Sequence, residues 1–225
     1  MTLLRVENRT DGRLSVTLDK GRAAQVVGFP REFNLDLAIH ELDSDSIIVA
    51  GLLIFGSKLW RQNLEAPIAS ETLSERMFEA GYPAEWMPVL ERSGSAPDYS
   101  LSRQNTLVVL PVNSERQELD ISGPGRLIYA HPLDVADWTG RVFGSSHLFF
   151  GTNLPLVASA SGINEAVLRL ATGVLIANDL RIGKISIPNA SPEVSSRDLL
   201  AMRALSSSIG LVVDFDENFW DREAE

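Results

Sequence analysis

The last third of the chain alternates short apolar runs with longer amphipathic segments, and this alternation limits the possible folds more than any other feature. Apolar runs at 154–159, 184–188 and 211–215 are separated by segments in which apolar residues recur at helical spacing. Strands that alternate with helices across short connections are typical of parallel βαβ units. The sequence therefore predicts a C-terminal βαβαβ unit with a mostly parallel sheet.

Capping residues mark the two helices of this unit. Ser161 precedes the periodic segment 162–179 and is its predicted N-cap. The second helix is predicted to start at Ser191-Pro192-Glu193, since proline is favoured in a first helical turn, and to stop at Gly210. No internal repeat is visible in the sequence.

The N-terminal residues predict a β-meander. The segment 14–18 alternates apolar and polar residues with period two, as a half-buried strand does. It lies between predicted strands at 3–7 and 23–27, and Asp11-Gly12 is a tight-turn signal. Phe33 to Ile39 is a candidate for a further strand.

Helices are predicted to follow the meander. Asp43 to Ser46 offers several capping side chains before a buried helix at 46–61, with a strand as the alternative at 46–50. A second helix, 71–80, has Ser70 as its predicted cap and Gly81 as its stop; Leu73, Met77 and Phe78 are expected on its inner face. A short helix interrupted by Pro88 is expected over 83–92.

Polar and turn-forming residues over 93–105 indicate a linker. We therefore expect an N-terminal domain at 1–92 and a C-terminal α/β domain at 106–225, with a single fused domain as the alternative. Further strands are predicted at 106–112, 117–121, 126–130 and 148–151. The predicted fold class is mixed α/β.

Composition excludes several classes of protein. The chain has 225 residues and no cysteine, which removes disulfides, thiolate catalysis and cysteine-based zinc sites. Its longest apolar region, 47–55, is well short of the roughly 20 residues of a membrane span. Met1 to Glu7 lacks the features of a signal peptide. We expect a soluble protein of the cytoplasm.

The net charge is −10, with 30 acidic residues against 20 lysines and arginines. Nucleic-acid binding uses clustered basic residues to neutralise phosphates, and here the basic residues are scattered. Nucleic acid and anionic membranes are therefore disfavoured as partners. The acidic balance instead favours a basic protein partner, with a homo-oligomer as a further alternative.

No coherent catalytic set is visible in the sequence. The three histidines, His40, His131 and His147, are expected to be structural or solvent-exposed, and phosphate-binding glycine motifs are missing. We predict no cofactor and no metal. Only weak candidates for catalysis can be named: Ser159 and Ser161, before a predicted helix N-terminus, and Asp214, at the end of a predicted strand.

Two resemblances bear on the C-terminal region. Leu211 to Asp216 looks like the first motif of haloacid-dehalogenase-type phosphatases, although that motif opens its domain and here lies near the end of the sequence. The order helix, strand, helix, strand resembles the back half of restriction-endonuclease-like nuclease domains. In those domains one strand carries Glu-x-Lys to hold magnesium; the corresponding run, 154–159, reads Leu-Pro-Leu-Val-Ala-Ser. The resemblance therefore implies a degenerate domain without its metal site.

Our first hypothesis is a non-enzymatic protein-interaction module: a regulator, adaptor or inhibitor with an acidic surface. The alternatives are the degenerate nuclease-like domain and an enzyme acting on a small phosphorylated or carboxylated metabolite. The enzyme's site would lie at the C-terminal ends of the strands, where ligands bind in open α/β sheets.

Overall fold

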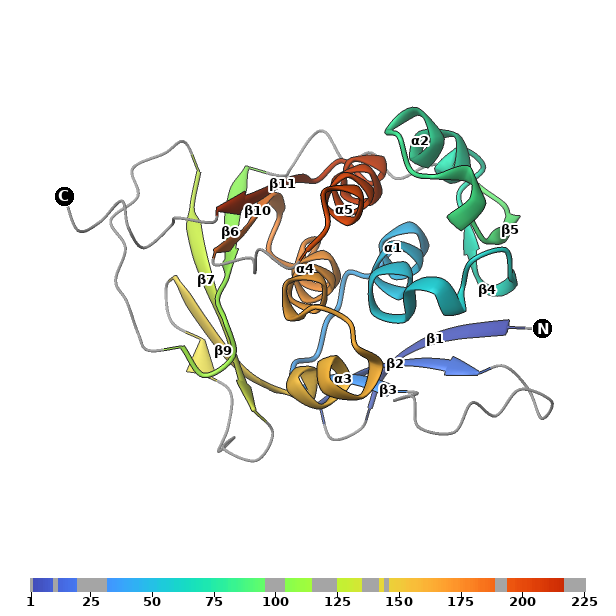
Figure 1. Cartoon of the computed structure of the whole chain (residues 1–225). Helices are drawn as coiled ribbons and strands as arrows, with labels where there is room; N and C mark the ends of the chain where they lie inside the picture. Colours follow the sequence, from blue (N-terminus) through green and yellow to red (C-terminus); the bar gives the residue numbers. More distant parts are fainter. Residues whose placement is uncertain are drawn as a thin grey trace.

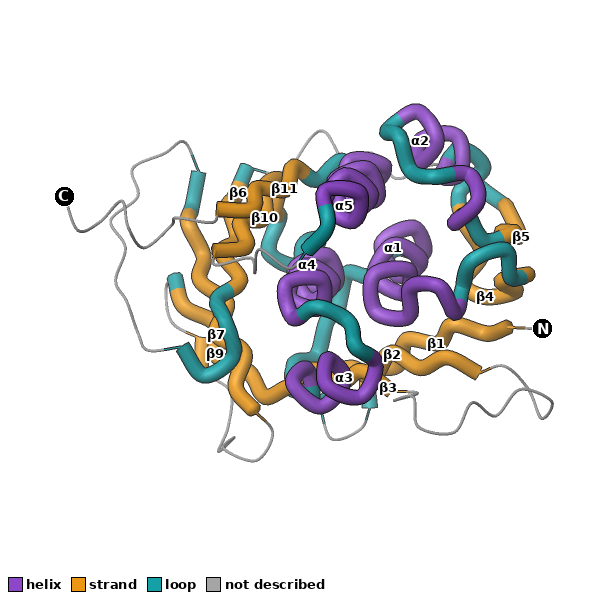
Figure 2. The backbone as a smooth tube through the Cα atoms, viewed as in Figure 1, coloured by secondary structure: helices purple, strands orange, loops and turns teal. Residues whose placement is uncertain are grey.

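One curved sheet wraps around the helices (Figures 1 and 2). The computed structural model describes residues 2–9, 12–19, 32–95, 104–114, 125–134, 142–143, 146–188 and 194–216. Within these residues the fold is mixed α/β, with five α-helices and an 11-stranded, mostly parallel sheet, which confirms the predicted fold class. No helix in these residues is long and apolar enough to cross a membrane.

Among the described residues, the N-terminal half of the sheet contains five strands. Its elements are β1 (Thr2–Asn8), β2 (Leu14–Asp19), β3 (Glu32–Leu35), α1 (Ser44–Phe55), the 3₁₀ turn η1 (Gly56–Lys58), β4 (Asn63–Ala69), α2 (Leu73–Glu79), the 3₁₀ turn η2 (Ala84–Trp86) and β5 (Val89–Arg92). Leu14, Val16 and Leu18 of β2 are buried, as the alternation predicts, but Ser15 between them is buried too. The strand order is β3-β2-β1-β4-β5.

In the described part of the C-terminal half lie the remaining strands and three helices. Its elements are β6 (Asn105–Val109), β7 (Leu127–Asp134), β8 (Val142–Phe143), β9 (His147–Thr152), α3 (Leu154–Ser161), α4 (Glu165–Ile176), β10 (Ile182–Pro188), α5 (Ser196–Ser208) and β11 (Val212–Asp216). Five of these strands run parallel in the order β9-β7-β6-β10-β11, and β8 pairs with β9. Of the predicted βαβαβ unit, both helices and the last two strands are present as α4, β10, α5 and β11, but its first strand is not at 154–159; the strand that precedes these helices is β9.

The halves join where β3 and β9 run antiparallel, with Leu35 opposite Thr152. The amide of Asp36 also donates to the carbonyl of Gly151 at 2.8 Å. On the concave side of the sheet, α1 packs against α4 and α2 packs against α5. The central pair is apolar nearly all round, because each helix lies between the sheet and the other helix.

The predicted strand at 154–159 is wrong: these residues belong to α3. Leu154 and Val157 are buried while Leu156 is exposed, which is helical rather than strand spacing. Pro155 lies in the first turn, where its fixed φ suits a helix. The segment 154–159, which the nuclease-like resemblance matches to a metal-binding strand, is therefore a helix.

Several other predictions need correction. Residues 83–92 form η2 and then β5 rather than a helix, and the strand expected from Phe33 to Ile39 ends at Leu35. Ser161 closes α3, where its hydroxyl donates to the carbonyl of Val157; Asn164 caps α4 instead. The predicted strands 23–27 and 117–121, the start signal 191–193 and most of the linker lie outside the described residues.

Candidate interaction surface

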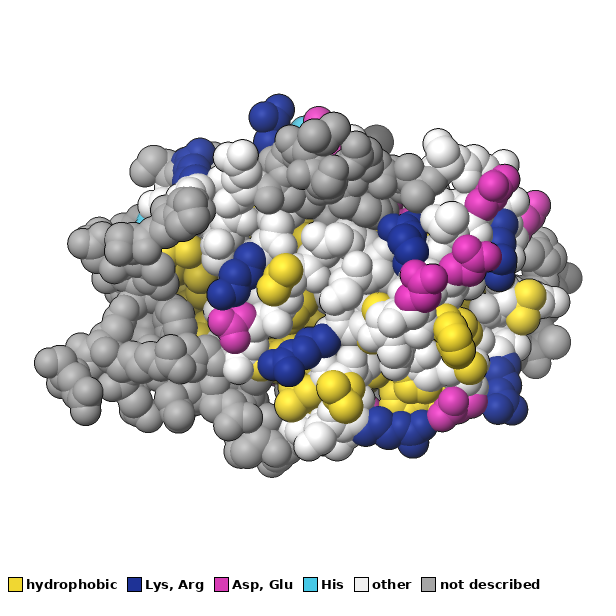
Figure 3. Space-filling view, turned by 90° about the horizontal axis from the view of Figure 1, so that it is seen from above, with side chains coloured by type: hydrophobic (Ala, Val, Ile, Leu, Met, Phe, Trp, Pro, Cys, Tyr) yellow, Lys and Arg dark blue, Asp and Glu magenta, His cyan; other side chains and the backbone are white. Residues whose placement is uncertain are grey.

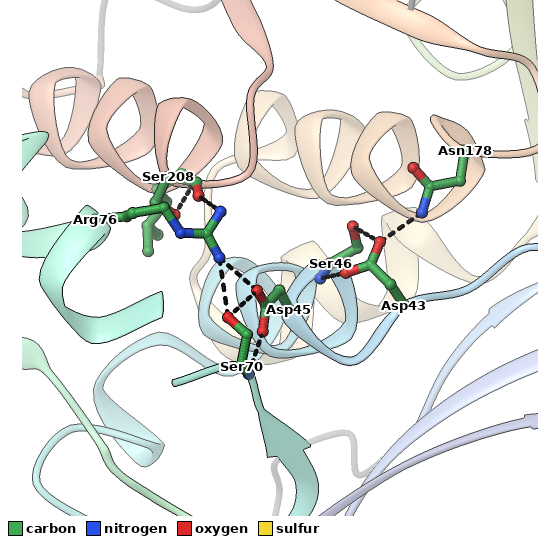
Figure 4. Close-up of polar contacts among 8 residues, drawn as sticks. Asp43, Asp45, Ser46, Ser70, Arg76, Asn178 and Ser208 are labelled. Atoms are coloured by element: carbon green, nitrogen blue, oxygen red, sulfur yellow. Dashed lines mark hydrogen bonds and ion pairs between the residues drawn. The ribbon is translucent and has the colours of Figure 1, made fainter. Parts of the chain in front are cut away.

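A buried polar cluster lies where α1, β4 and α2 meet (Figure 4). The side chain of Asp45, in the first turn of α1, is 1% exposed and accepts two hydrogen bonds from Ser70: 2.8 Å from the backbone amide and 2.6 Å from the hydroxyl. Arg76 on α2 donates to the same carboxylate at 2.6 Å. Ser70, the predicted N-cap of this helix, therefore donates to Asp45 instead, and the N-cap of α2 is Thr72.

The same cluster ties the two halves together. The second guanidinium nitrogen of Arg76 donates to the carbonyl of Ser208, near the end of α5, at 2.5 Å. Beside it, Asp43 caps α1 through Ser46 and accepts from Asn178, just after α4, at 2.5 Å. Figure 4 shows the two groups side by side, with the side chains of Arg76, Asp45 and Ser70 turned toward one another and Asp43 turned toward Asn178. The ion pair with Asp45 and the bond to Ser208 hold α2 on the core.

Because Arg76 points inward, the orientation of α2 is set. Leu73 and Met77 are buried on the same side as Arg76. At 3.6 residues per turn, this places Glu75, Phe78 and Glu79 on the opposite side. Phe78 is 65% exposed, so its expected place on the inner face was wrong. Its side chain is the largest apolar group on an otherwise acidic helix face.

The surroundings of Phe78 are acidic. Residues 71–92 contain five glutamates and two arginines, a net charge of −3. Glu71, Glu75, Glu79 and Glu91 are exposed, and the amide of Glu71 donates to the carbonyl of Gly94, which places the start of α2 beside the end of β5. Figure 3 shows acidic side chains over this end of the molecule, interspersed with basic ones. We call Glu71, Glu75, Phe78 and Glu79 the α2 surface.

The structure does not bring the three candidate catalytic residues together. Ser159 and Ser161 lie on α3, which packs against α4 and β3. Asp214 lies on β11, the strand at the far end of the sheet order, and forms an ion pair with Lys184 at 3.1 Å. Both members of that pair are about half exposed, so solvent screens their interaction.

Two histidines lie side by side on the outward face of β7 and β9. The Nε2 of His131 and the Nδ1 of His147 are 2.9 Å apart and share a hydrogen bond. Phe149 stacks on His131 at 4.2 Å and Tyr129 stacks on His147 at 5.1 Å between ring centroids. Across the residues with described positions, no three histidine, aspartate or glutamate side chains are grouped as a metal site. His40 is exposed.

Arg169 is a buried cation that the sequence analysis did not single out. Its guanidinium donates to the carbonyls of Pro188 at 2.8 Å and Val109 at 3.3 Å, at the ends of β10 and β6. Burial lowers the pKa of Arg169 to about 10, and the charge of Glu165 acts in the opposite direction. The sequence could have indicated this buried cation, because Arg169 lies among the regularly spaced apolar residues of 162–179.

Comparison of the chain with models of known protein families, with curated proteins and with solved structures gives no significant match.

Proposed function

We propose that the chain is a non-enzymatic interaction protein of the cytoplasm that binds a basic protein partner through the α2 surface. The observation that carries the proposal is Phe78, 65% exposed on a helix that Arg76 holds in place. Exposed aromatic side chains are frequent anchors of protein interfaces. A fixed helix also reduces the entropy lost when the partner binds.

The acidic rim defines the chemistry of the partner. Glu75 lies one turn from Phe78 on α2, Glu79 ends the same helix, and Glu71 lies just before its N-cap. A basic partner would be attracted over distances of about a Debye length, roughly 8–10 Å at physiological salt. Such attraction raises association rates more than it slows dissociation. The partner should therefore carry lysines or arginines around an apolar recess that accepts one aromatic ring.

The test uses the protein that co-purifies with the chain from its native host, purified in turn. We expect its association rate with the wild type to fall steeply as salt rises. Replacing Glu71, Glu75 and Glu79 with glutamine should slow association and flatten this salt dependence. The change Phe78→Ser should mainly speed dissociation, since it removes the buried anchor.

Leu156→Ser is the matched control, because Leu156 on α3 is also 65% exposed. This variant should bind like the wild type. A partner whose rates are the same for Phe78→Ser, Leu156→Ser and the glutamine variant binds elsewhere, and that result would refute the proposal.

A further inference from the structure

An apolar cavity of about 300 Å³ lies between the two halves. Leu52 and Leu53 of α1 line it from the N-terminal half, and Val167 of α4 with Met202 and Leu205 of α5 line it from the C-terminal half. A molecule in this cavity would contact three helices that belong to different halves. The cavity is separate from the α2 surface, whose residues do not line it.

Aromatic side chains form one wall of the cavity. Trp60 and Trp86 are stacked, with ring centroids 4.5 Å apart and planes within 5°. Tyr82 meets Trp86 edge-on at 6.1 Å. Arg197 of α5 lies 4.4 Å from the centroid of Trp86 and forms an ion pair with Glu85 at 2.6 Å. These contacts hold η2 against α5, so the wall is already formed before any ligand binds.

The mouth of the cavity is polar and acidic. Gly162 and Asp198 line it and are exposed, so the cavity opens to solvent beside them. Asp198 carries the one charge among the described lining residues. Its carboxylate accepts a hydrogen bond from the hydroxyl of Ser195 at 2.7 Å, which fixes its position at the start of α5. An anionic group at this mouth would be repelled, whereas a cationic group would be attracted.

We propose that this cavity binds a small molecule with an apolar body and an ammonium end. The body would lie against the leucines, Val167 and Met202, and the ammonium would lie at Asp198. A cavity of roughly 150 Å³ is enough to hold benzene, so about twice that volume holds roughly a dozen non-hydrogen atoms. The ligand class is therefore a small aliphatic or aromatic amine rather than a nucleotide or an acidic metabolite.

The experiment compares three probes with the same tail: octylamine, octanol and octanoate. Binding is followed by the fluorescence of Trp60 and Trp86, with a Trp86→Phe variant to assign the signal, and by the rise in melting temperature that a ligand of the folded state produces. We expect octylamine to bind more tightly than octanol by about fivefold, as one partly exposed ion pair allows. Octanoate should bind most weakly.

Two variants separate the apolar body from the charge. Ala201→Phe places a ring in the cavity and should weaken all three probes at least tenfold, while Leu200→Phe, at an exposed position of the same helix, should have no effect. Asp198→Asn keeps a capping acceptor and should leave octanol unchanged but remove the preference for octylamine. The proposal is overturned if no probe binds, if octanoate binds best, or if the Asp198→Asn variant still prefers octylamine. Probe binding that a folded Ala201→Phe variant leaves intact would overturn it too.

Discussion

In the N-terminal half, β1, β2 and β3 run antiparallel in sequence order, whereas in the C-terminal half β6, β7 and β9 run parallel. Despite this difference, the two halves have the same strand order. Numbered along the chain within each half, and leaving β8 aside, the strands follow the order 3-2-1-4-5: β3-β2-β1-β4-β5 in one half and β9-β7-β6-β10-β11 in the other. A hairpin joins antiparallel neighbours in a few residues, while parallel neighbours need longer crossovers. The same strand order therefore does not require the same chain direction in every strand.

Equivalent elements of the two halves also meet each other. The third strands pair as β3 and β9. The helix before each fourth strand packs against its equivalent, as α1 and α4, and so do the helices between the fourth and fifth strands, α2 and α5. Helix α3, which directly follows β9, has no counterpart among the described residues of the N-terminal half. These three pairings are what a two-fold axis between the halves would produce. The interface between the halves is therefore the centre of the core rather than a surface between separate cores.

The halves differ most in the charge they bury. α1 buries Asp45, which an opposite charge and two hydrogen bonds compensate. α4 buries Arg169, which has two carbonyl partners and a half-exposed Glu165 at 3.6 Å. An opposite charge offsets most of the desolvation cost of a buried charge, whereas neutral carbonyl dipoles offset less of it. This difference gives the comparison an energetic test.

The largest expected effect comes from separating the halves. Residues 1–95 and residues 104–225, expressed apart, would each expose one of the apolar helices α1 and α4. We expect neither fragment to melt cooperatively as a monomer and the mixture to regain a cooperative transition, as followed by circular dichroism. A fragment that melts cooperatively alone would instead favour two independent domains divided at the predicted linker.

The periodic elements could be predicted from the sequence. β2, α1, β10 and β11 follow from apolar spacing, since one face or the whole element is buried. The run 154–159 could not be assigned, because a short apolar run fits a buried strand as well as a helix. The run forms α3 because it packs against β3, which lies more than 100 residues earlier in the chain, and against α4, which follows it.

The candidate surface was less predictable than the fold. Phe78 was expected inside because it is apolar and adjacent to Met77. It is outside because Arg76 takes the inward position, and that depends on Asp45, 31 residues away, and on the carbonyl of Ser208. A sequence pattern shows residue types but does not show which distant groups will pair with them.

The second prediction concerns the buried charges. Asp45→Ala leaves Arg76 and Ser70 without their shared acceptor and should lower the free energy of unfolding by about 3 kcal/mol. Arg169→Met removes a charge that burial disfavours, so we expect a change of no more than about 1 kcal/mol. Urea unfolding at neutral pH measures both values.

A double variant, Asp45→Ala with Arg76→Met, provides the control for the ion pair. It should be more stable than the sum of the two single changes predicts, because no unpaired charge remains. If Arg169→Met proves more costly than Asp45→Ala, the energetic contrast between the halves is wrong.

The third prediction concerns one glycine in each central helix. A Cβ on Gly51 of α1 would overlap Cδ2 of Leu4, whereas one on Gly173 of α4 would lie 3.0 Å from Cδ1 of Ile185. Alanine favours a helix over glycine by about 1 kcal/mol. We therefore expect Gly173→Ala to be near neutral and Gly51→Ala to cost about 2 kcal/mol in unfolding experiments. Adding Leu4→Val to the Gly51→Ala variant should recover part of that loss. Equal costs at Gly51 and Gly173 would contradict the prediction, because they would mean that both helices lie equally close to the sheet.

The smallest expected effect at neutral pH comes from Tyr82, which lies where the halves meet. Burial raises the pKa of Tyr82 above its ordinary value of 10.0, and a hydrogen bond with Trp60 acts in the opposite direction. The unfolded chain therefore releases this proton at lower pH than the folded chain does. The stabilisation from the neutral phenol is complete below pH 10 and is lost as the pH rises toward the folded-state value.

Tyr82→Phe removes this titration and leaves the Trp60 N–H without its phenol partner. It should cost about 1 kcal/mol at neutral pH. Above pH 10 the cost should shrink or reverse, because only the wild type then loses stability through this group. Urea unfolding below and above pH 10, with the ultraviolet absorbance of tyrosinate as a direct record of the titration, measures both effects. A constant difference between variant and wild type across this range would mean that Tyr82 reaches solvent in the folded state, and the contact between the halves would then be looser than the burial of Tyr82 indicates.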